Sequence, residues 1–309
     1  MALQANASEN QRDLALLGFG EAARAYVRGW QQAGVAVDLT AYDVKTDTSG
    51  PQRQQMQEAY AAAAVVGVPN ASEAVSRAEV VFSFVTADQA LVAARSAQGG
   101  LRPGCIYFDC NSCAPRTKRA AAELVADVGG NYLDVAVMAP VHPRLNATPV
   151  LVSGAAADRG VEIMRSLGMP VRTIGPDVGQ ASSVKLVRSI MIKGMEALSA
   201  ECLLAGRTLG VEDVVLASLS ESFAGIDWNE MMHRNLERMM VHGRRRAAEM
   251  REACAMVEDL GLPGRMAQAS ANWQQQIGEQ TLSPLQDEIG PRSDRVLAAV
   301  TGSNARRRA

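Results

Sequence analysis

One lysine near the start of a long predicted helix has the side chain and the setting for acid–base chemistry. Lys185 lies in the first turns of a helix predicted over Gln180–Ala205, and Ser189 and Lys193 follow it at i+4 and i+8, on the same helix face. Burial and a neighbouring cation, Arg188, would lower the pKa of Lys185, so that a neutral amine could accept a proton. The alternative is a lysine that forms a salt bridge between two domains.

A polar loop is the second group of side chains that could bind a ligand. Asn111 and Ser112 follow a strand predicted over Ile106–Asp109, and their amide and hydroxyl groups can hydrogen-bond polar atoms of a ligand. In sheets built from parallel strands, loops at the carboxyl ends of the strands lie beside the ligand. We therefore expect Asn111 and Ser112 to bind substrate.

The same loop contains two cysteines, Cys110 and Cys113, which allow other readings. A C-x-x-C pair before a helix could form redox thiols, because the helix N-terminus would lower the pKa of a thiol. It could also form half of a zinc site. The chain has no second C-x-x-C pair, and its three histidines are scattered at positions 142, 233 and 242. We favour hydrogen bonding over thiol or metal chemistry and expect no metal site.

A glycine-rich turn near the N-terminus predicts a dinucleotide site. Gly18-x-Gly20-x-x-Ala23 stands between an apolar run, Leu14–Leu17, and a helical stretch that continues to about Ala33. Gly18 allows the tight turn, Gly20 lets a pyrophosphate approach the backbone, and Ala23 lets the helix pack on the strand. The helix N-terminus offers N–H groups to the phosphates. The residues predicted to bind the cofactor here are Gly18, Phe19, Gly20, Glu21 and Ala22.

The ends of two further strands extend this cofactor site. Asp43 follows a strand near Val35–Tyr42, where a carboxylate would bind the adenosine ribose and repel a 2′-phosphate. The next residue is Val44 and not an arginine that could bind a 2′-phosphate, so we expect NAD and regard NADP as less favoured. Val85 ends the buried strand predicted over Glu79–Val85 and Thr86 follows it, and both are also predicted to contact the cofactor.

Composition narrows the class of protein. The 309 residues are 48% hydrophobic and 21% charged, with a formal net charge of −2, which gives no electrostatic reason to expect nucleic acid or an anionic membrane as partner. The chain has no apolar run of about 18 residues, and its first residues are polar, so neither a membrane span nor a secretory signal is expected. Five cysteines, an odd number, suggest reduced thiols in a cytoplasm.

The order of predicted elements indicates the fold class. Strands and helices alternate up to about residue 178, which is typical of α/β proteins with a Rossmann-type doubly wound parallel sheet. Residues 179–309 are predicted to form an all-helical domain, joined to residues 1–178 by the long helix that carries Lys185. The further helices predicted after it are Val211–Leu219, Trp228–Val241, Arg244–Leu260 and Met266–Ile277.

Three motifs in order resemble the β-hydroxyacid dehydrogenase superfamily, which includes 3-hydroxyisobutyrate and 6-phosphogluconate enzymes. They are the glycine turn from Gly18, the segment Asp109-x-Asn111-Ser112-x-Ala114-Pro115, and Gly179-x-Ala181-x-x-x-Lys185. The chain departs from the best-studied members, and it is more similar to a phosphogluconate-dehydrogenase-like branch. Asn111 and Ser112 replace Ser and Thr of the second motif, and Arg188 and Ser189 stand where asparagines are usual.

The resemblance implies an NAD(P)-dependent dehydrogenase that acts on a CH–OH group of a small hydroxyacid or sugar acid. It also implies a homodimer, with residues 179–309 as the domain for substrate binding and dimerisation. In this hypothesis, Lys185 takes the proton of the substrate hydroxyl while hydride passes to the nicotinamide. Asn111, Ser112 and Ser189 orient the substrate, and Lys193 holds a carboxylate or phosphate group. The alternatives are an imine or ketone reductase of the same fold, whose members generally lack the lysine, and a non-catalytic NAD-binding sensor.

Overall fold

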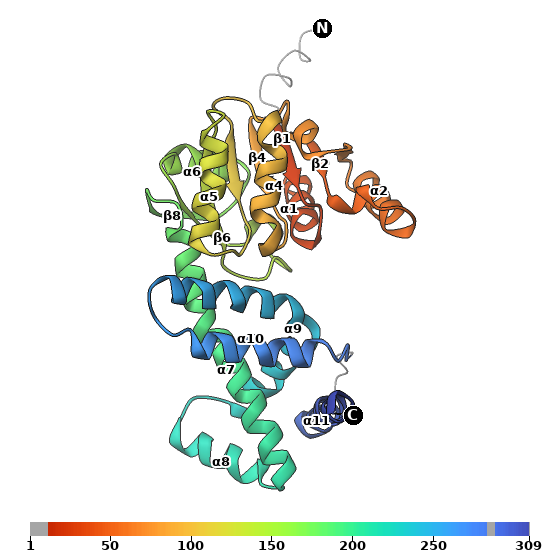
Figure 1. The fold of residues 1–309 in the computed structure, drawn as a ribbon, viewed down its shortest axis with the longest axis vertical. Helices are drawn as coiled ribbons and strands as arrows, with labels where there is room; N and C mark the ends of the chain where they lie inside the picture. Colours follow the sequence, from red (N-terminus) through yellow and green to blue (C-terminus); the bar gives the residue numbers. More distant parts are fainter. Residues whose placement is uncertain (1–11, 283–287, 309) are drawn as a thin grey trace. The chain divides into compact units, whose positions relative to one another are not determined.

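The computed structural model describes residues 12–282 and 288–308. The chain divides into two compact units, one up to Lys185 and one from Leu186 onward (Figure 1). Among the described residues, no helix is both long enough and apolar enough to cross a membrane.

An eight-stranded sheet forms the centre of the first unit. Its strands follow the order β3-β2-β1-β4-β5-β6-β7-β8, and every neighbouring pair is parallel except β6 and β7. The strand order reverses between β1 and β4, which is the switch point where such sheets bind ligands. The predicted doubly wound sheet is therefore confirmed. The strands are β1 Arg12–Leu17, β2 Val37–Tyr42, β3 Val66–Gly67, β4 Val80–Ser83, β5 Ile106–Asp109, β6 Asn131–Val137, β7 Val150–Ser153 and β8 Val171–Gly175.

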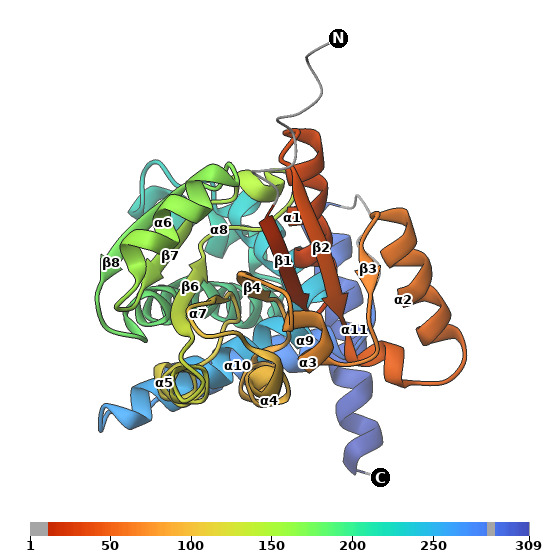
Figure 2. The same ribbon diagram turned by 90° about the horizontal axis from the view of Figure 1, so that it is seen from above.

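Helices cover both faces of this sheet (Figure 2). Successive residues of β1 alternate between the two cores, because side chains along a strand point to opposite faces. Leu14 and Leu16 pack with helices α1, α2 and α6, whereas Ala15 and Leu17 pack with α3, α4 and α5. The helices are α1 Glu21–Gln32, α2 Pro51–Ala62, α3 Ala71–Val75, α4 Ala90–Ala97, α5 Pro115–Ala126 and α6 Ala157–Ser166, with short 3₁₀ turns η1 Val44–Asp47, η2 Ala87–Gln89, η3 Gln98–Gly100 and η4 Leu145–Ala147.

The chain after the sheet is helical, as predicted. Helix α7, Gln180–Leu209, begins in the first unit and continues into the second. Three methionines of α9, Met232, Met239 and Met240, are buried in the core of the second unit. The remaining helices are α8 Glu212–Ser222, α9 Trp228–Asp259, α10 Arg265–Gly278 and α11 Ile289–Arg308.

One helix prediction is wrong. The segments Trp228–Val241 and Arg244–Leu260 form a single helix, α9, which continues through Gly243. The glycine is an approach point and not a break, because a Cβ there would lie 2.4 Å from the carbonyl oxygen of Gln274 and 2.8 Å from Cα of Gly278 in α10. The absence of a side chain therefore lets the two helix backbones meet.

Candidate active site

The glycine turn after β1 has the geometry of an anion site. Gly18 adopts a φ of +82°, and a Cβ there would come within 2.6 Å of the carbonyl oxygen of Phe84, so another residue would clash. Gly20 is the N-cap of α1 and makes no side-chain cap, whereas a Cβ added to it would meet nothing within 4 Å. Glu21 and Ala22 form the first turn of the helix. The turn thus leaves open space over backbone N–H groups that a phosphate could occupy.

Asp43 lies against this turn from the end of β2. Its carboxylate is buried; Oδ2 accepts a hydrogen bond from the Phe19 backbone N–H at 2.8 Å, and Oδ1 accepts one from Lys45 N–H at 3.0 Å. The structure therefore brings the predicted residues of the glycine turn and Asp43 together. A contact between Asp43 and a ribose remains a prediction.

Asn111 joins the loops that follow β4 and β5. Its Oδ1 accepts a hydrogen bond from Val85 N–H at 2.7 Å, and its Nδ2 donates to Ser83 Oγ at 2.9 Å and to Asp109 Oδ1 at 2.7 Å. Thr86 is exposed at the start of η2. These three bonds favour a role in positioning the two loops, and the predicted contact between Asn111 and substrate stays a prediction.

Lys185 meets the polar loop after β5. Its Nζ donates a hydrogen bond to Ser112 Oγ at 2.6 Å, although 73 positions separate the two residues in the chain. Both side chains are half-buried. The structure therefore places an amine and a hydroxyl side by side, next to the loops at the carboxyl ends of β4 and β5 where parallel sheets of this topology bind ligands.

A buried ion cluster beneath this pair was not predicted from the sequence. We call Asp109, Lys118, Tyr132 and Asp134 the Lys118 cluster. Lys118 Nζ lies 2.9 Å from Asp109 Oδ1 and 3.3 Å from Asp134 Oδ1, and the Tyr132 hydroxyl donates to Asp109 Oδ2 at 2.5 Å. All three charged side chains are almost completely inaccessible. The only trace of it in the sequence is that two apolar strands carry an aspartate each, Asp109 at the end of β5 and Asp134 within β6.

The electrostatics of the cluster follow from its burial and its charges. Burial by itself would lower the pKa of Lys118, but the carboxylates, Asp109 foremost, outweigh it and raise that pKa above its ordinary value. Burial, and then the neighbouring Asp109 carboxylate, raise the pKa of Tyr132. Lys118 therefore stays charged and Tyr132 stays neutral at physiological pH.

The first turn of α7 is attached to the same cluster. Asp134 Oδ2 accepts a hydrogen bond from Ser182 N–H at 2.8 Å, and Ser153 Oγ accepts one from Ala181 N–H at 3.0 Å. These are N–H groups of a first helical turn, which have no partner within the helix. A carboxylate at a helix N-terminus is also favoured by the helix dipole. The sheet thus holds the turn that precedes Lys185.

Ser189 and Lys193 belong to the second unit and contact each other. Lys193 Nζ donates to Ser189 Oγ at 3.1 Å and forms an ion pair with Glu249 Oε2 of α9 at 2.8 Å. Burial lowers the pKa of Lys193, and the Glu249 carboxylate opposes this shift. Glu249 was not among the predicted residues. The predicted contacts of Ser189 and Lys193 with substrate remain predictions.

The two loop cysteines lie in the core. Cys110 and Cys113 are both buried, and none of the five cysteines forms a disulfide. Burial raises the pKa of the Cys110 thiol, which disfavours the thiolate that redox chemistry needs. Among the described residues, no group of three or more His, Cys, Asp or Glu side chains could hold a metal ion.

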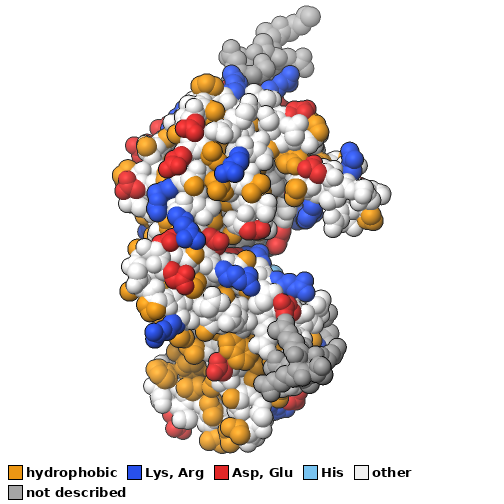
Figure 3. Space-filling view, viewed as in Figure 1, with side chains coloured by type: hydrophobic (Ala, Val, Ile, Leu, Met, Phe, Trp, Pro, Cys, Tyr) orange, Lys and Arg blue, Asp and Glu red, His pale blue; other side chains and the backbone are white. Residues whose placement is uncertain are grey.

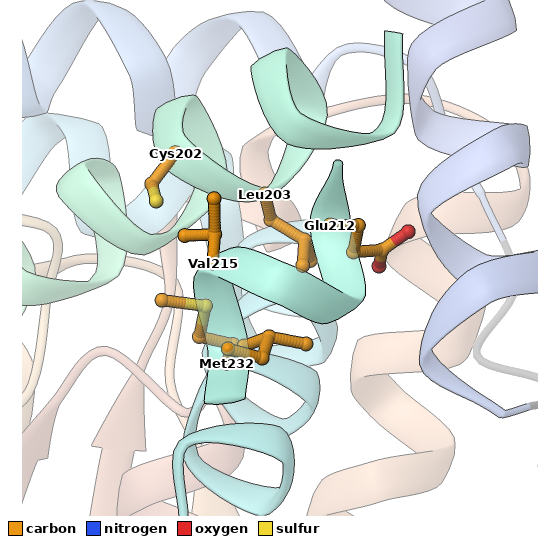
Figure 4. A pocket seen from close by; sticks show the side chains of 6 residues that line it. Cys202, Leu203, Glu212, Val215 and Met232 are labelled. Carbon is orange, nitrogen blue, oxygen red and sulfur yellow. The ribbon is translucent and has the colours of Figure 1, made fainter. Parts of the chain in front are cut away.

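A small pocket in the second unit lies apart from the predicted residues (Figure 4). Its walls are mostly apolar, and Glu212 contributes the only charged side chain among those that line it. Arg207 Nη1 lies 3.1 Å from Glu212 Oε2, so this carboxylate already has a cationic partner. The lining residues are Cys202, Leu203, Glu212, Val215, Leu216 and Met232.

Comparison with protein families gives two matches. Residues 13–175 match the family model described as the NAD binding domain of 6-phosphogluconate dehydrogenase, and residues 207–277 match a domain of unknown function, DUF1932. The first match covers more than half of the 309 residues. It includes the glycine turn, Asp43 and the loops after β4 and β5, and it ends before Lys185.

The chain is also similar to individual proteins. A conserved hypothetical protein from Sinorhizobium meliloti 1021 is 31% identical, with 94% of this chain and 96% of that chain covered and a TM-score of 0.73. The 3-hydroxyisobutyrate dehydrogenase of Pseudomonas aeruginosa is 26% identical over 171 residues, which are 52% of this chain and 56% of that relative. A Mycobacterium tuberculosis 3-hydroxyisobutyrate dehydrogenase, solved with L-serine, shares the fold at 16% identity, with 93% of this chain and 99% of that chain covered and a TM-score of 0.69.

Proposed function

We propose that this chain, which belongs to the family of the 6-phosphogluconate dehydrogenase NAD-binding domain within the β-hydroxyacid dehydrogenase superfamily, oxidises the CH–OH group of a small hydroxyacid or sugar acid. The observation that carries the proposal is the 2.6 Å hydrogen bond between Lys185 and Ser112. It sets an amine beside a hydroxyl next to the loops where a dinucleotide lies in sheets of this topology. The similarity to a 3-hydroxyisobutyrate dehydrogenase supports the same class of substrate.

The residues of the glycine turn fit a dinucleotide. Space over Gly20 and the N–H groups of α1 suit a pyrophosphate, and Asp43 ends the strand beside them. We assign NAD as the preferred cofactor, because the buried Asp43 carboxylate would repel the 2′-phosphate of NADP. NAD bound at this turn would supply the hydride acceptor for oxidation of the substrate carbon.

Lys185 supplies the proton transfer in this proposal. Its Nζ takes the proton of the substrate hydroxyl as the carbon is oxidised, and in the reverse direction it returns a proton to the carbonyl oxygen. Ser112 accepts a hydrogen bond from the same Nζ and so limits where the amine can point. Asn111 holds the backbone of Val85 and, with it, the loop that borders the cofactor site.

Replacement of Lys185 by Met tests the proposal. We expect turnover, followed by NADH absorbance on a panel that includes 3-hydroxyisobutyrate, L-serine and 6-phosphogluconate, to fall at least about a hundredfold. NADH binding, measured by fluorescence titration, should stay within about twofold of the unchanged protein. Near-normal turnover of the variant would contradict the proposed role of Lys185 as the acid–base residue.

The same panel separates the alternatives. An NAD-binding sensor would bind NADH and turn over none of the hydroxyacids. An imine reductase would reduce a cyclic imine with NADH or NADPH and would lose little activity in the Lys185→Met variant. A dehydrogenase should instead oxidise at least one hydroxyacid with NAD.

We also assign a homodimer and a cytoplasmic location to this enzyme. Large apolar side chains gather on the surface of the second unit over α8 (Figure 3), where Val214 and Phe223 are 72% and 54% exposed. Such a patch favours a protein–protein contact. Five cysteines outside any disulfide suit a reducing compartment. Light scattering should give about twice the 32.8 kDa of one chain, and a monomer mass would contradict the dimer.

A further inference from the structure

The Lys118 cluster holds both partners of the Lys185–Ser112 hydrogen bond. Ser112 lies three residues after Asp109, which binds Lys118 through its carboxylate at 2.9 Å and through its carbonyl oxygen at 2.7 Å. Lys185 lies three residues after Ser182, whose N–H donates to Asp134. Lys118 lies between the two aspartates. One buried ammonium group therefore connects the loop that carries the hydroxyl with the helical turn that carries the amine.

Several hydrogen bonds and an ion pair fix the position of the Asp109 side chain in this cluster. Asp109 Oδ1 accepts hydrogen bonds from Lys118 and from the N–H and Nδ2 groups of Asn111, while its Oδ2 accepts one from Tyr132. Burying two carboxylates and one ammonium group is costly, and apolar residues of similar volume often stabilise a protein as well or better. Stability alone is therefore a weak explanation of such a cluster, and the alternative is that it fixes the geometry of the groups bound to it.

We propose that Lys118 and Tyr132 are positioning residues for Lys185, an inference that rests on the proposed function. Neither touches substrate, because both side chains are buried. Lys118 keeps the two carboxylates together, and the Tyr132 hydroxyl fixes the orientation of Asp109. When the Lys118–Asp109 ion pair or the Tyr132–Asp109 hydrogen bond is lost, Asp109 can rotate. The loop that carries Ser112 can then move away from Lys185. A displacement of about 1 Å at a reacting group is enough to lower turnover by as much as about a hundredfold.

Tyr132→Phe and Tyr26→Phe form a matched pair of variants that tests the proposal. Each change removes one buried hydroxyl and keeps the ring. The Tyr132 hydroxyl donates to Asp109, whereas the Tyr26 hydroxyl has no hydrogen-bond partner among the described residues. With the panel substrate that turns over fastest, we expect kcat to fall about tenfold in Tyr132→Phe with KM within about twofold. In Tyr26→Phe, kcat should change less than about twofold.

A second measurement needs no substrate. The chain has four lysines, Lys45, Lys118, Lys185 and Lys193, so reductive ¹³C-methylation gives few side-chain NMR signals to assign. The methyl signals of Lys185 should shift in Tyr132→Phe and keep their positions in Tyr26→Phe. The larger change, Lys118→Met, should lower kcat further, and if that variant fails to fold, the tyrosine pair still decides.

The outcomes separate the two proposals. Lys185→Met with normal turnover defeats the proposed function. If Lys185→Met loses turnover while Tyr132→Phe matches Tyr26→Phe in kcat and in the Lys185 signals, only the positioning role is overturned. A fall in kcat together with shifted Lys185 signals supports both.

Discussion

Helix α7 carries two lysines that each bond to a serine hydroxyl, and the two pairs differ in almost every other respect. Lys185 is half-buried and reaches Ser112, which comes from a loop 73 positions earlier in the chain. Lys193 is buried, bonds to Ser189 within its own helix, and forms an ion pair with Glu249. The first bond depends on how the chain folds around the sheet, whereas the second follows from helical spacing alone.

This difference bears on which lysine can do chemistry. An amine that moves a proton must reach substrate, and Lys185 keeps part of its side chain accessible beside the ligand-binding edge of the sheet. Lys193 has a carboxylate 2.8 Å away and little access to solvent. Ion pairing of this kind is typical of a residue that joins helices. The comparison therefore favours Lys185 over Lys193 for the proposed acid–base role, and Lys193 is the better candidate for helix packing or anion binding.

Lys193 either joins helices through its ion pair with Glu249 or binds an anionic group of the substrate, and its replacement distinguishes these two roles. Lys193→Met would leave the Glu249 carboxylate without this cation, and we expect the free energy of unfolding to fall by about 2 kcal/mol. Urea unfolding followed by circular dichroism measures it. A tenfold rise in KM with unchanged stability would instead support the predicted contact between Lys193 and an anionic group of the substrate.

Ser112 and Ser189, the hydroxyl partners of the two lysines, are expected to differ in their effect on kcat. Ser112→Ala removes the acceptor of the Lys185 amine, and we expect kcat to fall about tenfold, which corresponds to about 1.4 kcal/mol. Ser189→Ala is the corresponding change beside Lys193, and we expect a smaller fall in kcat than in Ser112→Ala; a contact between Ser189 and substrate would raise KM. Equal effects of the two substitutions on kcat would remove the distinction between the pairs.

Asp43 is the residue that we expect to set the preference between NAD and NADP. Asp43→Asn keeps an oxygen that can accept from Phe19 N–H but removes the charge that repels a 2′-phosphate. We expect the ratio of kcat/KM with NAD to kcat/KM with NADP to fall about fivefold, or about 1 kcal/mol. An unchanged ratio would show that another residue sets the cofactor preference.

The smallest effect is expected at the cysteines. Both loop cysteines are buried, and the pKa of the Cys110 thiol is raised. A double Cys110→Ser, Cys113→Ser variant that folds should keep kcat within about twofold. Loss of turnover in a variant with a normal circular dichroism spectrum would instead support redox chemistry at these two thiols.

Most of the fold was predictable because its local signals are strong. Apolar runs such as Val80–Ser83 and Ile106–Asp109 alternate with helical segments, which is the pattern of a parallel sheet covered on both faces. The two-residue strand Val66–Gly67 was too short to show a pattern, and helix α11 was not predicted. The division of α9 into two predicted helices was wrong because a glycine inside a helical segment suggests a break. Only the structure shows that another backbone packs against Gly243.

The site was predictable only in part. Lys185, Ser112 and the glycine turn have residue types and local contexts that indicate their chemistry. Lys118 and Tyr132 gave no comparable signal, since a lysine in a charged helix and a tyrosine in a strand are ordinary surface and core residues. Asn111 was predicted as a ligand-binding residue, whereas the structure shows bonds to Ser83, Val85 and Asp109 that depend on two strands lying side by side.

The sequence by itself determined most of the order of strands and helices along the chain, the glycine turn, and the presence of one lysine at the start of α7. These depend on interactions between near neighbours in the chain. Only the tertiary structure decided that Lys185 meets Ser112 and that Lys118 lies between Asp109 and Asp134. Those contacts join residues of β5, α5, β6 and α7, and a buried charge can be recognised as paired only when the groups that surround it are known.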